Sequence, residues 1–212
     1  YRVTNKLLID RGISAKTDII FTRISEPVLD KKLTYPQAYK QGQVENEYLQ
    51  QCIVDWTACA REAGLSVLIL VEEIMHGEML NFALLTSQHK IMSQFIHGSE
   101  DTDVRREALA QFDSRELPVL IASRILDQGV SVDAIDVLIL AGSKKSKIRT
   151  LQRIGRGLRG KRLILIDFLN TTNKYLLEHS MKRVEDYKAE KCFKIQSSNP
   201  DASLLKRIWN ER

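Results

Sequence analysis

The chain has 212 residues, of which 43% are hydrophobic and 28% are charged, and a formal net charge of +5. This composition excludes a disordered chain, and apolar runs such as Val67–Val71 are far too short to span a bilayer. Cys52, Cys59 and Cys192 lack the spacing of a disulfide framework or a metal site. We therefore expect buried thiols in a reducing, cytoplasmic compartment, with no membrane partner.

The N-terminal part of the chain predicts two short elements and a loop. A helix is expected over Val3–Asp10, and a strand over Asp18–Ile24, where β-branched and aromatic residues cluster. Residues 26–43 are polar and contain Pro36, so they predict a loop or linker. Because the chain opens at Tyr1 without a methionine, we expect it to be a fragment of a longer protein.

A long amphipathic helix is predicted next, over Asn46–Ala63. Its apolar residues recur at helical spacing, with Asn46 suited to the N-cap and Gly64 just past the end.

Beyond residue 66, short apolar runs alternate with helical patterns. The expected strands are Val67–Val71, Met92–His97, Pro118–Ala122, Ile135–Ala141 and Arg162–Phe168. The expected helices are Ile74–Leu85, Asp101–Phe112, Ile148–Ile154, Thr172–Lys191 and Ala202–Asn210. This alternation predicts an α/β fold with a mostly parallel sheet flanked by helices. In such sheets, ligands bind beyond the carboxyl ends of the strands.

The positive charge is concentrated in one segment. Nine basic residues and no acidic residue lie between Lys144 and Arg162, whereas the rest of the chain has 23 basic and 27 acidic residues, a net charge of −4. Such a run is either a solvated face or a binding site for the phosphates of a nucleotide or a nucleic acid.

Two patterns suggest chemistry that their context argues against. Gly155, Gly157 and Gly160 match a dinucleotide-binding motif, but they follow a helical stretch and precede a strand, the reverse of the required order. Glu72 and Glu73 follow a buried strand as a metal-binding acidic box would, but the chain has no phosphate-binding loop for such a box to serve. We interpret these two glutamates as surface acids at a strand-to-helix turn.

The residues Gln152-Arg-Ile-Gly-Arg-Gly-Leu-Arg159 resemble motif VI of the superfamily 2 helicases. Upstream, the segment from Ala122 to Ser131 resembles motif V, and Phe95-Ile-His-Gly98 with its following helix resembles the strand and turn that precede motif V. The order and spacing agree from Val67 to Phe168. The chain thus resembles the C-terminal RecA-like lobe of a superfamily 2 DNA helicase, closest to the phage UvsW-like and XPB-like branches.

This resemblance implies a P-loop NTPase-type fold without its own P-loop, and a division of the chain into three parts. Residues 1–45 would be an inter-lobe segment leading into this lobe, 46–196 the helicase C-terminal domain, and 197–212 a tail helix. One position departs from the family pattern, because Ser131 stands where the family commonly has an aspartate that organises the nucleotide pocket.

The resemblance also implies roles for particular residues around a bound ATP. Arg156 and Arg159 would be arginine fingers, which suits a guanidinium that stays charged and binds phosphate oxygens in pairs. Gln152 would sense the γ-phosphate, and Gly129 would approach the nucleotide, with Asp127 and Ser131 beside it. The associated Mg²⁺ would be held by a separate first lobe, with no metal ligand in this one.

The remaining implied roles concern nucleic acid, for which DNA is expected and RNA stays open. The residues expected to meet its backbone are Gly98, Ser123, Lys144, Lys145 and Lys147. The leading hypothesis is the second motor lobe of an ATP-dependent helicase or translocase. Two alternatives remain: a nucleic-acid-binding or adaptor module without ATP chemistry, and the motor lobe of a restriction-type translocase.

Overall fold

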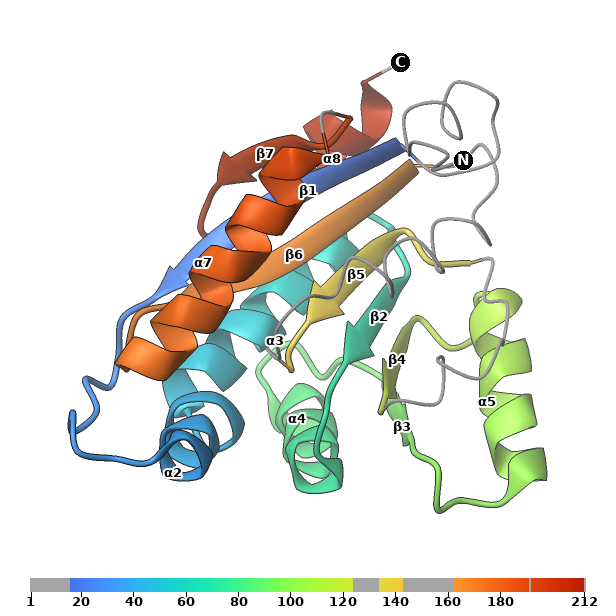
Figure 1. Cartoon of the computed structure of the whole chain (residues 1–212). Coiled ribbons are helices and arrows are strands. Elements are labelled where there is room, and N and C mark those ends of the chain that lie inside the picture. Colours follow the sequence, from blue (N-terminus) through green and yellow to red (C-terminus); the bar gives the residue numbers. More distant parts are fainter. Residues whose placement is uncertain (1–15, 124–133, 143–161, 191, 212) are drawn as a thin grey trace, which may run out of the picture.

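A computed structural model gives the structure of the chain and describes residues 16–123, 134–142, 162–190 and 192–211. Within these ranges, seven strands form one sheet in the order β3-β4-β2-β5-β6-β1-β7 (Figure 1). Every neighbouring pair is parallel. The strands are β1 (Lys16–Ile24), β2 (Val67–Leu70), β3 (Gln94–Ile96), β4 (Val119–Ala122), β5 (Val137–Leu140), β6 (Arg162–Asn170) and β7 (Lys194–Ser197).

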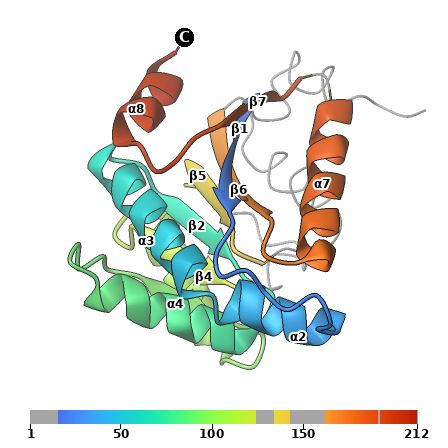
Figure 2. The ribbon, with the colours of Figure 1, turned by 90° about the vertical axis from the view of Figure 1, so that its left-hand side faces the viewer.

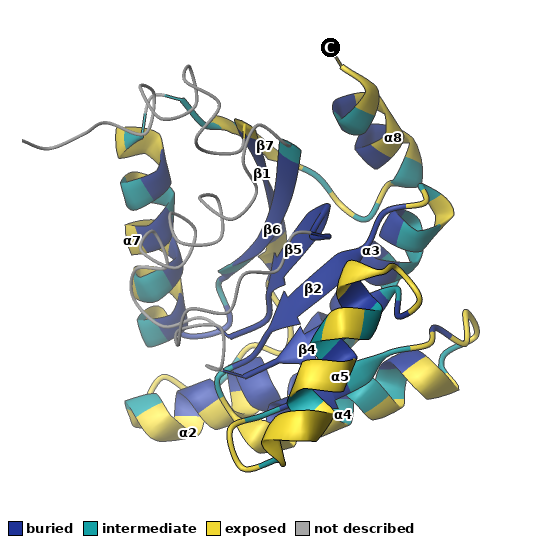
Figure 3. Ribbon diagram, turned by 90° about the vertical axis from the view of Figure 1, so that its right-hand side faces the viewer, coloured by how far each residue is buried: buried dark blue, intermediate teal, exposed yellow. Residues whose placement is uncertain are grey.

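Helices cover both faces of this sheet. They are α2 (Tyr35–Tyr39), the π-helical segment η1 (Lys40–Val44), α3 (Glu47–Glu62), α4 (Ile74–Thr86), α5 (Thr102–Asp113), α7 (Lys174–Ala189) and α8 (Ala202–Asn210). Helices α3, α4 and α8 pack on one face, and α5 and α7 pack on the other (Figures 2 and 3). None of the described helices is both long and apolar enough to cross a membrane.

The central strands are buried on both faces, as their unbroken apolar runs predict. In β2, Val67 and Ile69 face the core under α3, α4 and α8, whereas Leu68 and Leu70 face the core under α5 and α7. Alternate residues of a strand point to opposite faces, so a four-residue strand contributes to both cores. The predicted α/β fold with a parallel sheet is confirmed.

Strand β1 lies inside the sheet, between β6 and β7. It pairs with β6 from Lys16↔Arg162 to Ile24↔Asn170. The sheet therefore draws on residues before position 45 as well as on the central part of the chain. Helix α8, at the other end of the chain, buries Leu204, Leu205 and Ile208 against the core shared with α3 and α4.

The prediction of a loop over residues 26–43 is wrong for its second half, where α2 and η1 form. Thr34 and Gln37 make a capping box at the start of α2, and Pro36 occupies the first turn of the helix. Proline is well tolerated there, because its fixed φ suits the helix and its missing N–H would have no partner in that turn. Pro36 thus begins a helix where the sequence analysis took it for a helix breaker.

Other boundaries follow the sequence closely. Asn46 caps α3 as predicted, with its side chain accepting a hydrogen bond from the backbone N–H of Leu49, and Gly64 has a φ of +75° just past the helix end. Strand β3 is shorter than expected. Strand β7 was not predicted, because its largely exposed residues show no apolar run. The helices predicted over 3–10 and 148–154 lie outside the described residues.

Candidate functional site

The candidate site is the edge of the sheet where four neighbouring strands end. The register pairs Leu70 of β2 with Ala122 of β4 and with Leu140 of β5. Ile96 of β3 also pairs with Ala122. Because parallel strands end at the same edge, the residues that follow them lie together there, which is the usual ligand-binding position in such sheets.

Two of the residues predicted to bind nucleic acid, Gly98 and Ser123, lie at neighbouring strand ends of this edge. Ser123 directly follows β4, is 8% exposed, and donates a backbone hydrogen bond of 3.1 Å to the carbonyl of Ile96. Gly98 lies two residues beyond the end of β3 and is exposed, and a Cβ added to it would meet no atom within 4 Å. The backbone of Gly98 is therefore accessible to a ligand.

The turn that carries Gly98 is fixed by hydrogen bonds. The backbone N–H of His97 donates to Oε2 of Glu100 at 2.9 Å, and the N–H of Glu100 donates to the carbonyl of His97 at 3.1 Å. The N–H of Ser99 donates to Nδ1 of His97 at 3.3 Å, and the His97 ring packs 5.2 Å from that of Phe95. These contacts hold Gly98 at the tip of a closed turn.

The other predicted site residues lie outside the described residues. They are Asp127, Gly129, Ser131, Lys144, Lys145, Lys147, Gln152, Arg156 and Arg159. In sequence, they follow directly after two described strand ends, because Ser123 precedes the segment 124–133 and Gly142 precedes the segment 143–161. Their roles stay predictions.

Sequence reasoning missed Gly142, which allows the ends of β2 and β5 to approach. A Cβ at this position would lie 2.6 Å from Cγ of Glu72 and 2.8 Å from the backbone nitrogen of Glu72. The N–H of Gly142 donates to the carbonyl of Leu70 at 3.0 Å. Only glycine fits so close a backbone approach, and the signal available in the sequence was a glycine directly after a buried strand.

Sequence reasoning also missed Gln43, a fully buried residue of η1. Its side-chain amide donates to the carbonyl of Ala141, the residue after β5. The side chain of Asn170, at the end of β6, donates to the carbonyl of Gly42 at 2.7 Å. These two amides tie η1 to the carboxyl edge, a role that depends on long-range contacts and leaves no local signal.

Of the two acidic residues that follow β2, Glu73 is exposed, as predicted for a surface acid, and Glu72 is half-buried. Burial, together with the charges of Glu72 and Glu73, raises the pKa of the nearby Tyr35 hydroxyl. Across the part of the chain that the structure describes, no three His, Cys, Asp or Glu side chains gather as metal ligands.

Residues 45–161 match the model of one protein family, the helicase conserved C-terminal domain. The chain is similar to the ATP-dependent DNA helicase uvsW of Enterobacteria phage T4, with 29% identity over 58% of this chain and 28% of the relative. It is also similar to the ATP-dependent helicase Lhr-Core protein 2 of Thermococcus barophilus, with 42% identity over 28% of this chain and 7% of the relative.

Solved structures share the fold. The crystal structure of T4 UvsW matches with a TM-score of 0.70 and 19% identity, over 89% of this chain and 42% of that one. Dbp5 of S. cerevisiae, bound to RNA and ADP BeF3, matches with a TM-score of 0.65 and 13% identity, over 93% of this chain and 46% of that one. The chain spans less than half the length of each of these relatives.

Proposed function

The chain belongs to the helicase conserved C-terminal domain family and has the RecA-like fold of superfamily 2 helicases, and on this premise we propose that it is the second motor lobe of an ATP-dependent nucleic-acid helicase or translocase. The observation that carries the proposal is the family match over residues 45–161, which includes both segments that follow the converging strand ends. ATP would be bound between this lobe and a first lobe.

The proposed catalytic contribution of this lobe is positive charge. Hydrolysis of ATP builds negative charge on the transferred phosphoryl group, and catalysis depends mostly on positioning and electrostatic stabilisation. Arg156 and Arg159 would supply guanidinium groups to it, and Gln152 would contact the γ-phosphate. Gly129, Asp127 and Ser131 would line the nucleotide site beside them.

We propose that a first lobe holds the Mg²⁺ ion, as the resemblance to superfamily 2 helicases implies. The proposed nucleic-acid contacts are those of Gly98, through its exposed backbone, of Ser123, and of Lys144, Lys145 and Lys147. Contacts of this kind position a strand without reading its sequence. They suit DNA and RNA alike, and the proposal leaves the choice to experiment.

The test is ATP turnover by the complete protein carrying Arg156→Ala. Loss of one arginine finger costs about 10³–10⁵ in turnover rate where the role is established, so we expect a fall of at least about 10³-fold with nucleic-acid affinity largely kept. Arg207→Ala, on the exposed side of α8, is the matched control and should leave the rate unchanged.

An unchanged rate in the Arg156→Ala protein would remove this residue from catalysis. If the complete protein binds nucleic acid but hydrolyses no ATP, the alternative of a binding or adaptor module with this fold replaces the motor.

A further inference from the structure

The carboxyl end of β5 extends past the pairing of this strand with β6. That pairing ends at Ile139↔Ile166, whereas β6 itself continues to Asn170. Two residues further along β5, the carbonyl of Ala141 accepts a hydrogen bond from the side-chain amide of Gln43. A side chain of η1 thus continues the hydrogen bonding of β5 where its pairing with β6 has ended.

Gln43 is held in turn by a second buried amide. The side chain of Asn170, at the end of β6, donates to the carbonyl of Gly42 at 2.7 Å and to Oε1 of Gln43 at 3.4 Å. The Oδ1 atom of Asn170 accepts hydrogen bonds from the N–H and the hydroxyl of Thr172, at 3.1 and 2.7 Å. Gln43 and Asn170 have no exposed surface, so solvent does not compete for these bonds. The two amides therefore link the ends of β5 and β6 through η1.

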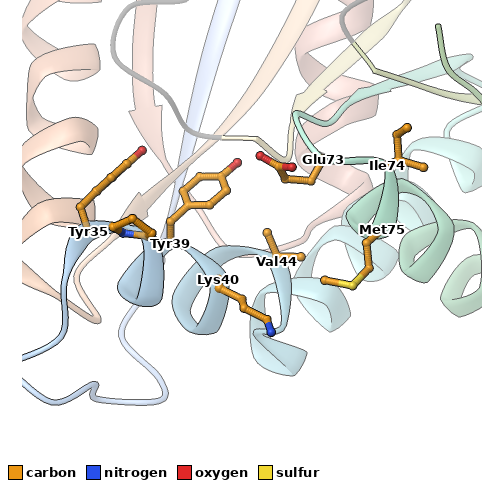
Figure 4. Close-up of a pocket in the computed structure, with 8 residues that line it drawn as sticks. Tyr35, Tyr39, Lys40, Val44, Glu73, Ile74 and Met75 are labelled. Atoms are coloured by element: carbon orange, nitrogen blue, oxygen red, sulfur yellow. The ribbon is translucent and has the colours of Figure 1, made fainter. Parts of the chain in front are cut away.

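The π-helical segment η1 also packs closely against α7. A Cβ at Gly42 would lie 2.5 Å from Cδ1 of Leu176, so a side chain here would displace its neighbour. Tyr39 and Val44, on either side of this glycine, pack with Leu176 as well. In Figure 4, the buried Tyr39 and the exposed Lys40 point in opposite directions beside the start of α4. The inner side of the segment is therefore fixed in the fold.

We propose, on the basis of the function proposed above, that Gln43 is a positioning residue, which fixes the end of β5 from which the segment with Arg156 and Arg159 continues. An arginine stabilises the transferred phosphoryl group only where its guanidinium reaches the developing charge. A displacement of about 1 Å costs about 100-fold in rate where such geometry is critical. Ala141 and Gly142 are the last described residues before that segment, so the bond from Gln43 acts at its base.

A purely stabilising role of Gln43 predicts a different result. Loss of a buried hydrogen bond lowers the free energy of unfolding in either case. A stabilising role changes the rate of hydrolysis only through the fraction of unfolded protein, whereas a positioning role lowers the rate of the folded protein. Urea denaturation of each variant therefore identifies conditions in which all of them are folded, and the rates are compared there.

The test is ATP hydrolysis by the complete protein carrying Gln43→Met, which keeps the length of the side chain and removes the amide. We expect kcat to fall at least about ten-fold while KM for ATP changes less than about three-fold, because the arginines act mainly in the transition state. Leu205→Ala, on the buried side of α8, is the matched control. It should also lower the urea midpoint, because it leaves a cavity in the core, and it should leave kcat unchanged.

A second measurement separates positioning from a general disturbance of the lobe. In a protein that carries Arg156→Ala and Arg159→Ala, adding Gln43→Met should lower the residual single-turnover rate less than about two-fold, because the groups that Gln43 positions are already missing. Asn170→Ser has a side chain too short to hold Gln43. It should repeat the fall in kcat, and it decides the question if Gln43→Met does not fold.

Two outcomes would overturn this inference and leave the proposed function standing. The first is a folded Gln43→Met protein with an unchanged kcat. The second is an equal loss of rate with and without the two arginines, which would mean that Gln43 only stabilises the lobe. If Arg156→Ala leaves the turnover rate unchanged, the proposed function itself fails, and the positioning role of Gln43 fails with it.

Discussion

His76 is a titratable residue that is buried in the core. It lies in the first turns of α4, has no exposed surface, and neither of its ring nitrogens has a hydrogen-bond partner among the described residues. Burial lowers the pKa of His76 to about 4. The side chain is therefore a neutral, space-filling group of the core at neutral pH.

This burial predicts a loss of stability in mild acid. The unfolded chain takes up a proton on His76 near its ordinary pKa of about 6.5, whereas the folded chain does so only near 4. As the pH falls from 8 to 5, the unfolded state binds more protons than the folded state, so the free energy of unfolding falls by about 2 kcal/mol over this range. Urea denaturation at several pH values measures this slope.

His76→Leu removes the titrating group and the two unpartnered nitrogens. We expect it to unfold at the same or higher urea concentration at pH 7.5 and to lose most of this pH dependence. His89→Leu, in the exposed turn after α4, should keep the original slope. A His76→Leu protein that still loses about 2 kcal/mol over this range would show that other groups cause the acid sensitivity.

Single residues also mark how far the sequence predicts the site. Gly98 and Ser123 were chosen through the family resemblance, and the structure puts both after strands that end at one edge of the sheet, whereas their roles stay predictions. Gly142 and Gln43 could not be given their roles, since these depend on Glu72 and Ala141 approaching from distant parts of the chain. Contacts between residues that are far apart in the chain leave no periodic pattern in the sequence.

At the scale of elements, α7 is anchored to β6 by a buried ion pair. Arg183 is 1% exposed and donates from Nε to Oδ2 of Asp167 at 2.9 Å and from Nη2 to Oδ1 at 3.0 Å. Asp167 has no exposed surface and also accepts a hydrogen bond of 3.0 Å from the hydroxyl of Tyr187. Helix α7 thus makes a buried, charged contact with β6.

Removing only one partner of this ion pair should lower the free energy of unfolding strongly. Arg183→Met leaves the Asp167 carboxylate buried without a counter-charge, which typically costs about 3–5 kcal/mol. Combining Arg183→Met with Asp167→Leu and Tyr187→Phe leaves no buried charge or hydroxyl unpaired, so this triple variant should be more stable than Arg183→Met alone. Chemical denaturation of both variants measures the difference.

Lys182→Met is the control for this comparison. Lys182 pairs with Asp186 at 3.1 Å on the exposed side of the same helix. Exposed ion pairs are screened by solvent and contribute little to stability, so the stability of this variant should remain close to that of the unchanged chain. A triple variant less stable than Arg183→Met would contradict this account, because it would mean that the ion pair stabilises more than an apolar replacement.

Elements with strong periodic patterns were predictable, and those without were not. Helix α3 was predicted from its apolar spacing and its Asn46 cap, and β2 from its continuous apolar run. The α2–η1 segment was missed because its apolar residues are few and because Tyr39 and Val44 pack with Leu176 of α7, far away in sequence. Strand β7 was missed because an edge strand with mostly exposed residues does not need a hydrophobic pattern.

At the scale of the whole molecule, the sheet brings together segments that are separate in the sequence. The body of the chain has a net charge of −4, and the segment 144–162 that follows β5 adds +9. Four strand ends meet at the edge from which this segment continues. We therefore propose that the sheet positions the contacts to phosphates, and that the basic segment supplies most of the positive charge.

The measurement that tests this account most directly is steady-state ATP turnover by the 212-residue chain alone and by the complete protein, each with and without single-stranded nucleic acid. A lobe that supplies arginines but no phosphate-binding loop should show no measurable turnover by itself. The complete protein should hydrolyse ATP faster when nucleic acid is present. Turnover by the isolated chain at an ordinary rate of about 1–100 s⁻¹ would contradict the central claim that it is one half of a divided motor.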